Sequence, residues 1–293
     1  MHDLEARLAA LPIWSGPLAI EPLPGGMTNR NLLVSAPQGR FVVRIAGDNA
    51  AHGIDRSAEQ AATRAAARAG LGPELFWAEP DLMVMRHVSG HTLARRNFED
   101  KYTLAGAVEL LRNTYLKLPL YYEGPKQDRR PLTVLARYAD ALTRAPGRWR
   151  EAVESHRSLL SLLAPRLADI PQGFAHNDVH GDNLIDDGSR LWLVDWEYAG
   201  QGQPLADIAS LANNAMMAEG AANTALELWL GRTATERDLS SFAAMRLATA
   251  LRDLFWGYAQ DSAQQGSADR SQIDLAGYIG INEDRVKIAV GRL

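Results

Sequence analysis

Short apolar runs separated by turn-forming residues open the chain. Residues 18–23, 30–36 and 41–47 are largely apolar, and Gly, Pro and Asn occupy the gaps between them. This pattern predicts three antiparallel strands joined by tight turns. Residues 55–70 are rich in Ala, carry charges at helical spacing and end in Gly, which predicts a helix.

After this helix the chain returns to strands and then changes character. Two strands are expected at 73–79 and 81–88. Most of the remaining chain is Leu- and Ala-rich, and helices are predicted over residues 99–118, 131–145, 148–168, 204–218, 221–231 and 235–264. A hairpin is expected at 184–196, where Asp-Gly-Ser separates two apolar runs. The order predicts an α+β fold, with a small sheet-and-helix lobe over residues 1–88 and a larger, mainly helical lobe over residues 89–293.

Composition narrows the class of partner. The 293 residues carry a net charge of -4, so no basic surface for nucleic acid is expected. There is no cysteine, which excludes disulfides and thiolate metal sites. The N-terminus does not resemble a signal peptide, and no run approaches the roughly 18 apolar residues of a membrane span. We therefore expect a cytoplasmic protein without a membrane span, its oligomeric state left open.

Candidate chemistry is concentrated in residues 174–200, where five aspartates and two histidines lie beside short apolar runs. Asp178 follows an apolar start, Asn183 comes five residues later, and Asp195 closes the second expected hairpin strand. Carboxylate and amide oxygens are the ligands that Mg²⁺ prefers, together with phosphate oxygens and water. Asn183 and Asp195 are therefore candidate metal ligands for a magnesium nucleotide. Asp178 is then the candidate base that accepts the proton of an attacking hydroxyl.

This segment resembles the catalytic core of the protein-kinase-like small-molecule kinases, the group of aminoglycoside phosphotransferases and choline/ethanolamine kinases. Their pattern is His-x-Asp-x4-Asn followed by an apolar strand ending in Asp, and it stands here as His176-Asn177-Asp178, Asn183 and Leu193-Val194-Asp195. The resemblance implies a two-lobed protein-kinase-like fold, ATP and Mg²⁺ as cofactors, and a loop-bracing role for His176. The competing interpretation is an acidic surface hairpin. Turn or loop roles are expected for His180, Asp182, Asp186 and Asp187.

The predicted small lobe supplies candidates for the nucleotide. The segment between the first two expected strands contains Gly25, Gly26, Thr28 and Asn29. Glycine lets backbone N–H groups approach phosphate, although such a segment alone is simply a turn. The resemblance makes it the nucleotide loop, since choline kinases often have Gly-Gly-x-Thr-Asn there. It also implies a hinge whose backbone meets adenine, at Met85, Arg86 and Val88.

The cation expected on the third strand is Arg44. Many relatives have Lys at this position, and Arg is a variation of the choline-kinase branch. Arginine keeps the charge and can donate two hydrogen bonds to a phosphate or a carboxylate. Glu59 on the following helix is the candidate partner that orients Arg44, with Asp55 on the same helix as the alternative. A strand-edge arginine in water is the competing interpretation of Arg44.

Two further segments resemble the acceptor region of choline and ethanolamine kinases. They are Asp-Trp-Glu-Tyr-Ala-Gly at 195–200 and an aromatic helix at 251–260. Because aromatic faces and a carboxylate suit a quaternary ammonium, the predicted acceptor residues are Glu197, Tyr198, Trp256 and Tyr258. Such a cluster is also common in helical cores.

Two positions depart from the acceptor pattern of the family. Ala259 stands where the family has a second tryptophan, and Asn213 and Asn214 stand where an acidic residue is usual. Asp207, which follows the first acceptor segment, is expected to brace the catalytic loop by hydrogen bonding.

These features predict an ATP- and Mg²⁺-dependent kinase that phosphorylates the hydroxyl of a small amino alcohol, with choline or ethanolamine as first candidates. An aminoglycoside or thiamine kinase of the same fold is the alternative within the enzyme class. Residues 225–260 carry as many basic as acidic side chains, which disfavours a polycationic acceptor. The alternative outside the enzyme class is a catalytically silent nucleotide-binding scaffold.

Overall fold

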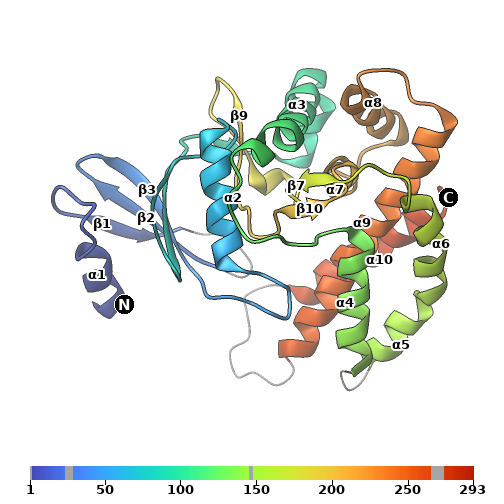
Figure 1. Cartoon of the computed structure of the whole chain (residues 1–293), viewed down its shortest axis with the longest axis horizontal. Coiled ribbons are helices and arrows are strands. Elements are labelled where there is room, and N and C mark those ends of the chain that lie inside the picture. Colours follow the sequence, from blue (N-terminus) through green and yellow to red (C-terminus); the bar gives the residue numbers. More distant parts are fainter. Residues whose placement is uncertain (1, 24–28, 145–147, 265–273) are drawn as a thin grey trace.

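The computed structural model describes residues 2–23, 29–144, 148–264 and 274–293, and it confirms the predicted α+β architecture (Figure 1). Five antiparallel strands form one sheet in the order β1-β2-β3-β5-β4. They are β1 (Ala19–Pro22), β2 (Arg30–Ala36), β3 (Gly39–Ile45), β4 (Leu75–Glu79) and β5 (Leu82–Arg86). Leu32 pairs with Val43 and Val34 with Phe41, and all four side chains are buried. Burial of one apolar face fixes this register.

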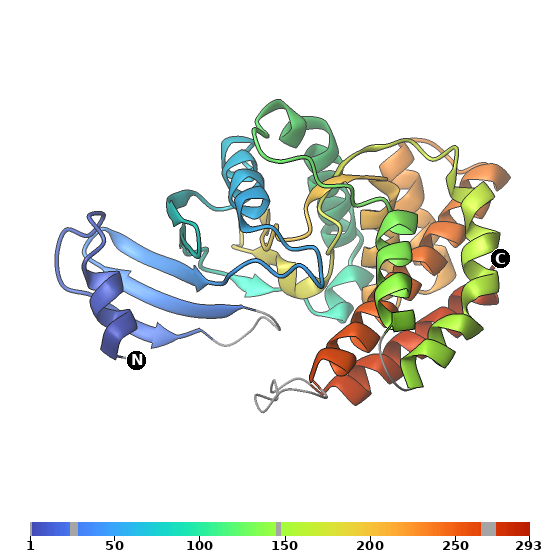
Figure 2. The same cartoon turned by 60° about the horizontal axis from the view of Figure 1, so that its bottom comes forward.

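Two helices flank the sheet. α1 (His2–Ala9), which the sequence pattern did not predict, buries Leu8 against the sheet core. α2 (Arg56–Arg68) begins at Asp55, whose side chain accepts hydrogen bonds from the next backbone N–H groups, and Gly70 at φ 72° follows its end. Ala62, Ala65 and Ala66 of α2 belong to the core of the helical region rather than to the sheet core. Figure 2 shows α2 between the two regions.

The helical region contains one long helix, α9, against which α4, α7 and α10 pack. The helices are α3 (Lys101–Lys117), α4 (Pro131–Arg144), α5 (Arg148–Ser155), α6 (Arg157–Leu167), α7 (Leu205–Asn214), α8 (Glu219–Leu230), α9 (Glu236–Gln264) and α10 (Leu275–Val290). The predicted helix at 148–168 is divided into α5 and α6 at His156. α10 was not predicted from the sequence, because its glycines weaken the helical pattern. Asp274 caps its N-terminus and α9 covers its apolar face.

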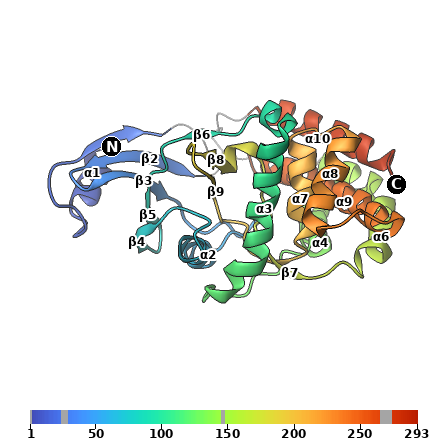
Figure 3. The same ribbon diagram turned by 90° about the horizontal axis from the view of Figure 1, so that it is seen from above.

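The acidic hairpin consists of two short strands and lies between the sheet and the helices (Figure 3). The hairpin is β8 (Leu184–Asp186) and β9 (Leu191–Leu193), with Gly188 at φ 87° in its turn. It is shorter than expected, because the chain leaves the strand before Asp195. The remaining short elements are β6 (His91–Thr92), β7 (Gly173–Ala175), β10 (Gly200–Gly202), η1 (Arg95–Glu99), η2 (Leu118–Leu120) and η3 (Gly181–Asn183).

The chain passes from the sheet to the helical region between β5 and β6, and the boundary at residue 88 stays a prediction. Among the helices that the structure describes, none combines the length and the apolar character that a bilayer crossing requires.

Candidate active site

Asp207 fastens the loop that carries Asp178. Its Oδ2 accepts a hydrogen bond from the backbone N–H of His176 at 2.9 Å, and its Oδ1 accepts one from the N–H of Asn177 at 2.7 Å. Asp207 is buried, which raises the pKa of its carboxyl, whereas His176 and these two N–H donors act against that increase. The contacts agree with the bracing role expected for Asp207.

The side chain of His176 also stabilises this loop through two contacts. Its Nε2 lies 2.9 Å from the carbonyl oxygen of Val194, and its Nδ1 lies 3.3 Å from the backbone nitrogen of Asp178. One proton on Nε2 satisfies both contacts, because Nε2 then donates and Nδ1 accepts. The imidazole is buried and packs edge-on against Trp196. His176 therefore supports the loop and does not face the cleft.

Two residues of the candidate site have strained backbone conformations. Asn177 has φ 65° and Asp195 has φ 66°, values that non-glycine residues seldom adopt. Such conformations persist only where the surroundings impose them, and they are concentrated at functional sites. Here the hydrogen bonds of Asp207 and His176 impose that of Asn177.

Asp178 and Asn183 lie in direct contact. The amide nitrogen of Asn183 donates to the backbone oxygen of Asp178 at 2.9 Å and approaches its Oδ2 at 3.4 Å. Burial would raise the pKa of Asp178, but His180, whose Nε2 lies 3.7 Å from Oδ2, lowers it to about 2. Asp178 is therefore ionised at neutral pH and able to accept a proton. His180 thus acts on Asp178, beyond the loop role expected for it.

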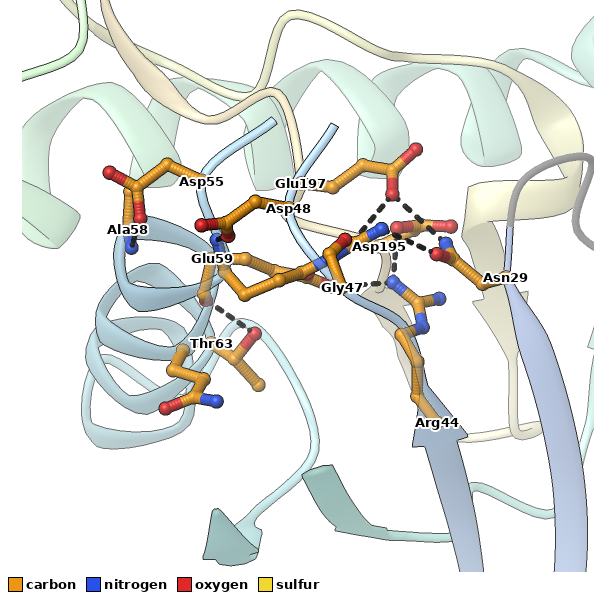
Figure 4. A network of polar contacts seen from close by, with 12 residues as sticks. Asn29, Arg44, Gly47, Asp48, Asp55, Ala58, Glu59, Thr63, Asp195 and Glu197 are labelled. Carbon is orange, nitrogen blue, oxygen red and sulfur yellow. Dashed lines mark hydrogen bonds and ion pairs between the residues drawn. The ribbon is translucent and has the colours of Figure 1, made fainter. Parts of the chain in front are cut away.

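Arg44 joins the sheet to the acidic hairpin (Figure 4). Its Nη1 donates to Glu59 Oε1 at 2.6 Å and to Asp195 Oδ1 at 2.5 Å. Burial would lower the pKa of Arg44, but the two carboxylates more than compensate and raise it. Arg44 is 8% exposed, so it is not a strand-edge arginine in water. Glu59 is its helix partner, whereas Asp55 caps the helix.

A second arginine, which the sequence interpretation missed, completes this network. Arg56 Nη1 contacts Glu59 Oε2 at 2.5 Å and Glu197 Oε2 at 2.9 Å, while its Nη2 donates to Asn29 Oδ1 at 2.7 Å. Asn29 in turn donates to Glu197 at 2.9 Å. Burial and the Asp195 carboxylate raise the pKa of Glu197 to about 7. The i,i+3 spacing of Arg56 and Glu59 was the one local signal for this pair.

The donor set suits a hard divalent cation. The Asn183 amide nitrogen is engaged with Asp178, which leaves the carbonyl oxygen to serve as a ligand. Carboxylate oxygens of Glu59, Asp195 and Glu197 also lie within 4.8 Å of one another. All of these are oxygen donors, which Mg²⁺ prefers. Asn183 and Asp195 would hold the ion, which requires Asp195 to share its carboxylate between the ion and Arg44.

A cleft of about 890 Å³ lies between the sheet and the helical region, and it is lined by Arg44, Asp178, Asn183, Asp195 and Glu197. Met85, Arg86 and Val88, the predicted hinge residues, also line this cleft, and the Arg86 guanidinium lies over the ring of Phe41. Of the predicted nucleotide loop, Asn29 is described, and the other three positions lie outside the described residues: Gly25, Gly26 and Thr28.

The cleft has an aromatic wall formed by Tyr198, Trp256 and Tyr278, and this wall includes two of the predicted acceptor residues. Trp256 Nε1 donates to the Tyr198 hydroxyl at 3.0 Å, and its ring meets Tyr278 edge-on at 5.2 Å. Tyr258 is not part of this wall. Its ring stacks on Trp149 and its hydroxyl contacts Glu283, so its placement gives no support to an acceptor role.

The polar residues beside the wall include functional candidates that the sequence interpretation missed. Arg252 donates to the backbone oxygen of Asn177 at 2.7 Å and is paired with Asp253. Its spacing of four residues from Trp256 on one helix could have indicated it. Asn214 lines the cleft and donates to the Val179 oxygen, whereas Asn213 is engaged in the core.

Comparison with known proteins agrees with this geometry. Residues 19–244 match the phosphotransferase enzyme family. Protein LicA of Haemophilus influenzae is 26% identical over 71% of this chain and 62% of its own length. A probable ethanolamine kinase of Arabidopsis thaliana is 27% identical over 67% of this chain and 56% of its own length. The matched part thus spans less than two thirds of each of these relatives.

A solved structure shares the fold over nearly the whole chain. It is a choline/ethanolamine kinase family protein from Mesorhizobium loti, with a TM-score of 0.75 and 25% identity over 99% of this chain and 94% of that one. The family match covers most of the chain and includes the catalytic loop, the acidic hairpin and the arginine network. The chain therefore belongs to the phosphotransferase enzyme family, and the relatives that it resembles within that family include choline and ethanolamine kinases.

Proposed function

We propose that this protein is an ATP- and Mg²⁺-dependent phosphotransferase that phosphorylates the hydroxyl of a small amino alcohol, with choline and ethanolamine as first candidates. The observation that best supports the proposal is the set of hydrogen bonds that fixes the loop with Asp178. Asp207 and His176 hold Asp178 against Asn183 at the cleft, where Asp195 also lies. A scaffold protein without catalytic function would not need this strained and ionised arrangement.

Each residue has a defined part in the proposed reaction. The acceptor oxygen attacks the terminal phosphorus, the bond from that phosphorus to the ADP oxygen breaks, and Asp178 accepts the hydroxyl proton. Asn183 and Asp195 hold the metal, which when bound neutralises charge on the phosphate oxygens. Arg44, oriented by Glu59, binds the nucleotide phosphates. The hinge backbone at Met85 and Val88 meets the adenine.

Transfer of labelled phosphate from ATP to a panel of hydroxyl compounds tests the proposal. Choline, ethanolamine, thiamine and kanamycin represent the competing acceptor classes. We expect transfer to the amino alcohols, loss of transfer on chelation of Mg²⁺ and its recovery when Mg²⁺ is restored. Magnesium-dependent ATP binding without transfer to any hydroxyl compound would instead support the silent scaffold. Kanamycin or thiamine as the sole substrate would retain the catalytic roles and reject the acceptor class.

A further inference from the structure

The acceptor end of the cleft carries more positive charge than an amino alcohol needs. Arg129, Arg252 and Arg285 all line it, together with the aromatic wall. Arg252 is balanced by Asp253, whose Oδ1 accepts from Nε at 2.9 Å and from Nη2 at 2.8 Å. Within the part of the chain that the structure describes, neither Arg129 nor Arg285 forms an ion pair with a carboxylate.

Arg129 is a buried guanidinium with unused donor capacity. It is 3% exposed, and its Nη2 donates to the Gly53 oxygen at 2.7 Å and more weakly to the Glu197 backbone oxygen at 3.4 Å. Its Nε is buried without a hydrogen-bond partner. Burial lowers the pKa of Arg129, and Arg137 lowers it further. Because buried charges are normally paired, this side chain is suited to an anionic partner that comes from outside.

Arg285 repeats this situation at the other end of the wall. Its Nη1 donates to Asn282 at 3.0 Å and its Nη2 approaches the Asn214 backbone oxygen at 3.5 Å, while its Nε is buried without a partner. Tyr278 and Arg285 are seven residues apart and therefore share one face of α10. Arg129 lies over the ring of Tyr198, with 5.6 Å between guanidinium carbon and ring centroid. Arg129 thus lies over the aromatic residue at one end of the wall, and Arg285 shares a helix face with the aromatic residue at the other end.

The aromatic residues and the arginines favour different chemical groups on one acceptor molecule. The faces of an aromatic wall suit an ammonium group. A guanidinium repels an ammonium but binds a carboxylate through two parallel hydrogen bonds. We infer that the acceptor is a zwitterion, an amino alcohol that also bears a carboxylate, and that Arg129 and Arg285 supply the positive charge for this carboxylate, with Arg129 as its direct partner. The inference rests on the proposed function and narrows its acceptor, while the transfer chemistry at the hydroxyl is unchanged.

Matched pairs of acceptors that differ by one carboxylate test this inference. Homoserine is compared with 3-aminopropanol, and serine with ethanolamine, in the Mg²⁺- and ATP-dependent transfer assay. For the wild-type protein we expect kcat/KM to be at least about tenfold higher for the carboxylate member of at least one pair, because only that member forms charged hydrogen bonds with the guanidinium. Arg129→Met is expected to remove most of this advantage through KM for the acceptor, with KM for ATP retained. Arg129→Lys, which keeps the charge, should restore part of it.

Two further variants keep the test decisive. Arg285→Met changes a less buried side chain, so it provides a reading if Arg129→Met does not fold. Arg130→Met alters the exposed neighbour of Arg129, which is paired with Asp128, and should leave the preference as it is. If the arginines instead bind the transferred phosphoryl group, their replacement by Met would lower kcat/KM equally for both members of a pair. That result would overturn the inference.

The outcomes also separate the inference from the proposed function. Transfer to choline or ethanolamine without a preference for the carboxylate member overturns the inference and leaves the proposed function standing. No transfer to any hydroxyl compound overturns both. A preference for the carboxylate member that Arg129→Met and Arg285→Met leave unchanged would overturn the role assigned to the arginines.

Discussion

Arg44 donates a hydrogen bond to Asp195 over 2.5 Å, which joins the cation of the sheet to a candidate metal ligand 151 residues further along the chain. The same Nη1 contacts Glu59 at 2.6 Å. All three side chains are largely buried, so the contacts are little screened by water. If nucleotide and metal bind at this point as proposed, they must redistribute the contacts of Arg44, and the network would then couple the nucleotide site to the acidic hairpin.

Replacement of Arg44 by Met should weaken both folding and nucleotide binding. It leaves Asp195 without its partner and Glu59 with Arg56 alone, so we expect a loss of about 3 kcal/mol in the free energy of unfolding. KM for ATP should rise at least about tenfold, because a charged hydrogen bond to phosphate is lost. Denaturant unfolding and steady-state kinetics measure the two effects. Arg40→Met, an exposed change on the same strand, should produce neither.

Asp178→Asn should abolish most of the turnover without harming the fold. The amide matches the carboxylate in shape but cannot accept the hydroxyl proton, and general base catalysis contributes about 10²- to 10⁴-fold. ATP affinity, measured by calorimetry, should stay within about threefold of the wild type, well under the tenfold that 1.4 kcal/mol would give. Asp182→Asn is the matched control, because the Asp182 side chain is 84% exposed in the same loop. Wild-type turnover in Asp178→Asn would remove Asp178 from the mechanism.

Asp207→Asn should lower turnover through the position of the loop. An amide in this place turns its NH₂ group toward one of two backbone N–H donors, at His176 or Asn177, and a donor then faces a donor. We expect about 1–3 kcal/mol less stability and a reduced kcat with ATP affinity retained. Asp274→Asn at the N-cap of α10 is the control, since Asn and Asp cap helices about equally well. Equal losses in both variants would contradict the bracing role.

Stability should fall in acid through His52. The ring is buried against Trp256 and its Nδ1 contacts the Tyr138 hydroxyl at 3.1 Å. Burial lowers its pKa from 6.5 to about 4, aided by Arg137. The unfolded chain therefore takes up a proton between these values while the folded chain does not. Stability is unaffected by His52 above pH 6.5 and falls as the pH drops toward 4, by up to about 3 kcal/mol.

Denaturant unfolding at pH 7 and pH 4.5 measures this effect. The difference in unfolding free energy between the two values should shrink in His52→Gln. The exposed His91 provides the matched control, because His91→Gln should keep the wild-type difference. An unchanged difference in His52→Gln would show that other groups cause the acid sensitivity.

Residues whose partners are close in the chain could be predicted from the sequence, because spacing along one loop or hairpin fixes spacing in space. The pattern of strands and helices, the loop with Asp178 and Asn183, and the hairpin that leads to Asp195 are of this kind. The amphipathic periods that define these elements are also local. Sequence alone therefore determined the fold class and the candidate catalytic set.

Only the tertiary structure decided the partners that long loops bring together. Arg56 contacts Glu197, which lies 141 residues further along the chain, and no local pattern in the sequence predicts that contact. Trp256 and Tyr258 lie on one helix with similar surroundings in sequence, yet the first lines the cleft and the second packs on Trp149. The balance of charge around the acceptor likewise depends on Arg129, which comes from a connection before α4. The burial of a side chain and the pairing of its charge depend on segments that are distant in the sequence, and the fold alone determines both.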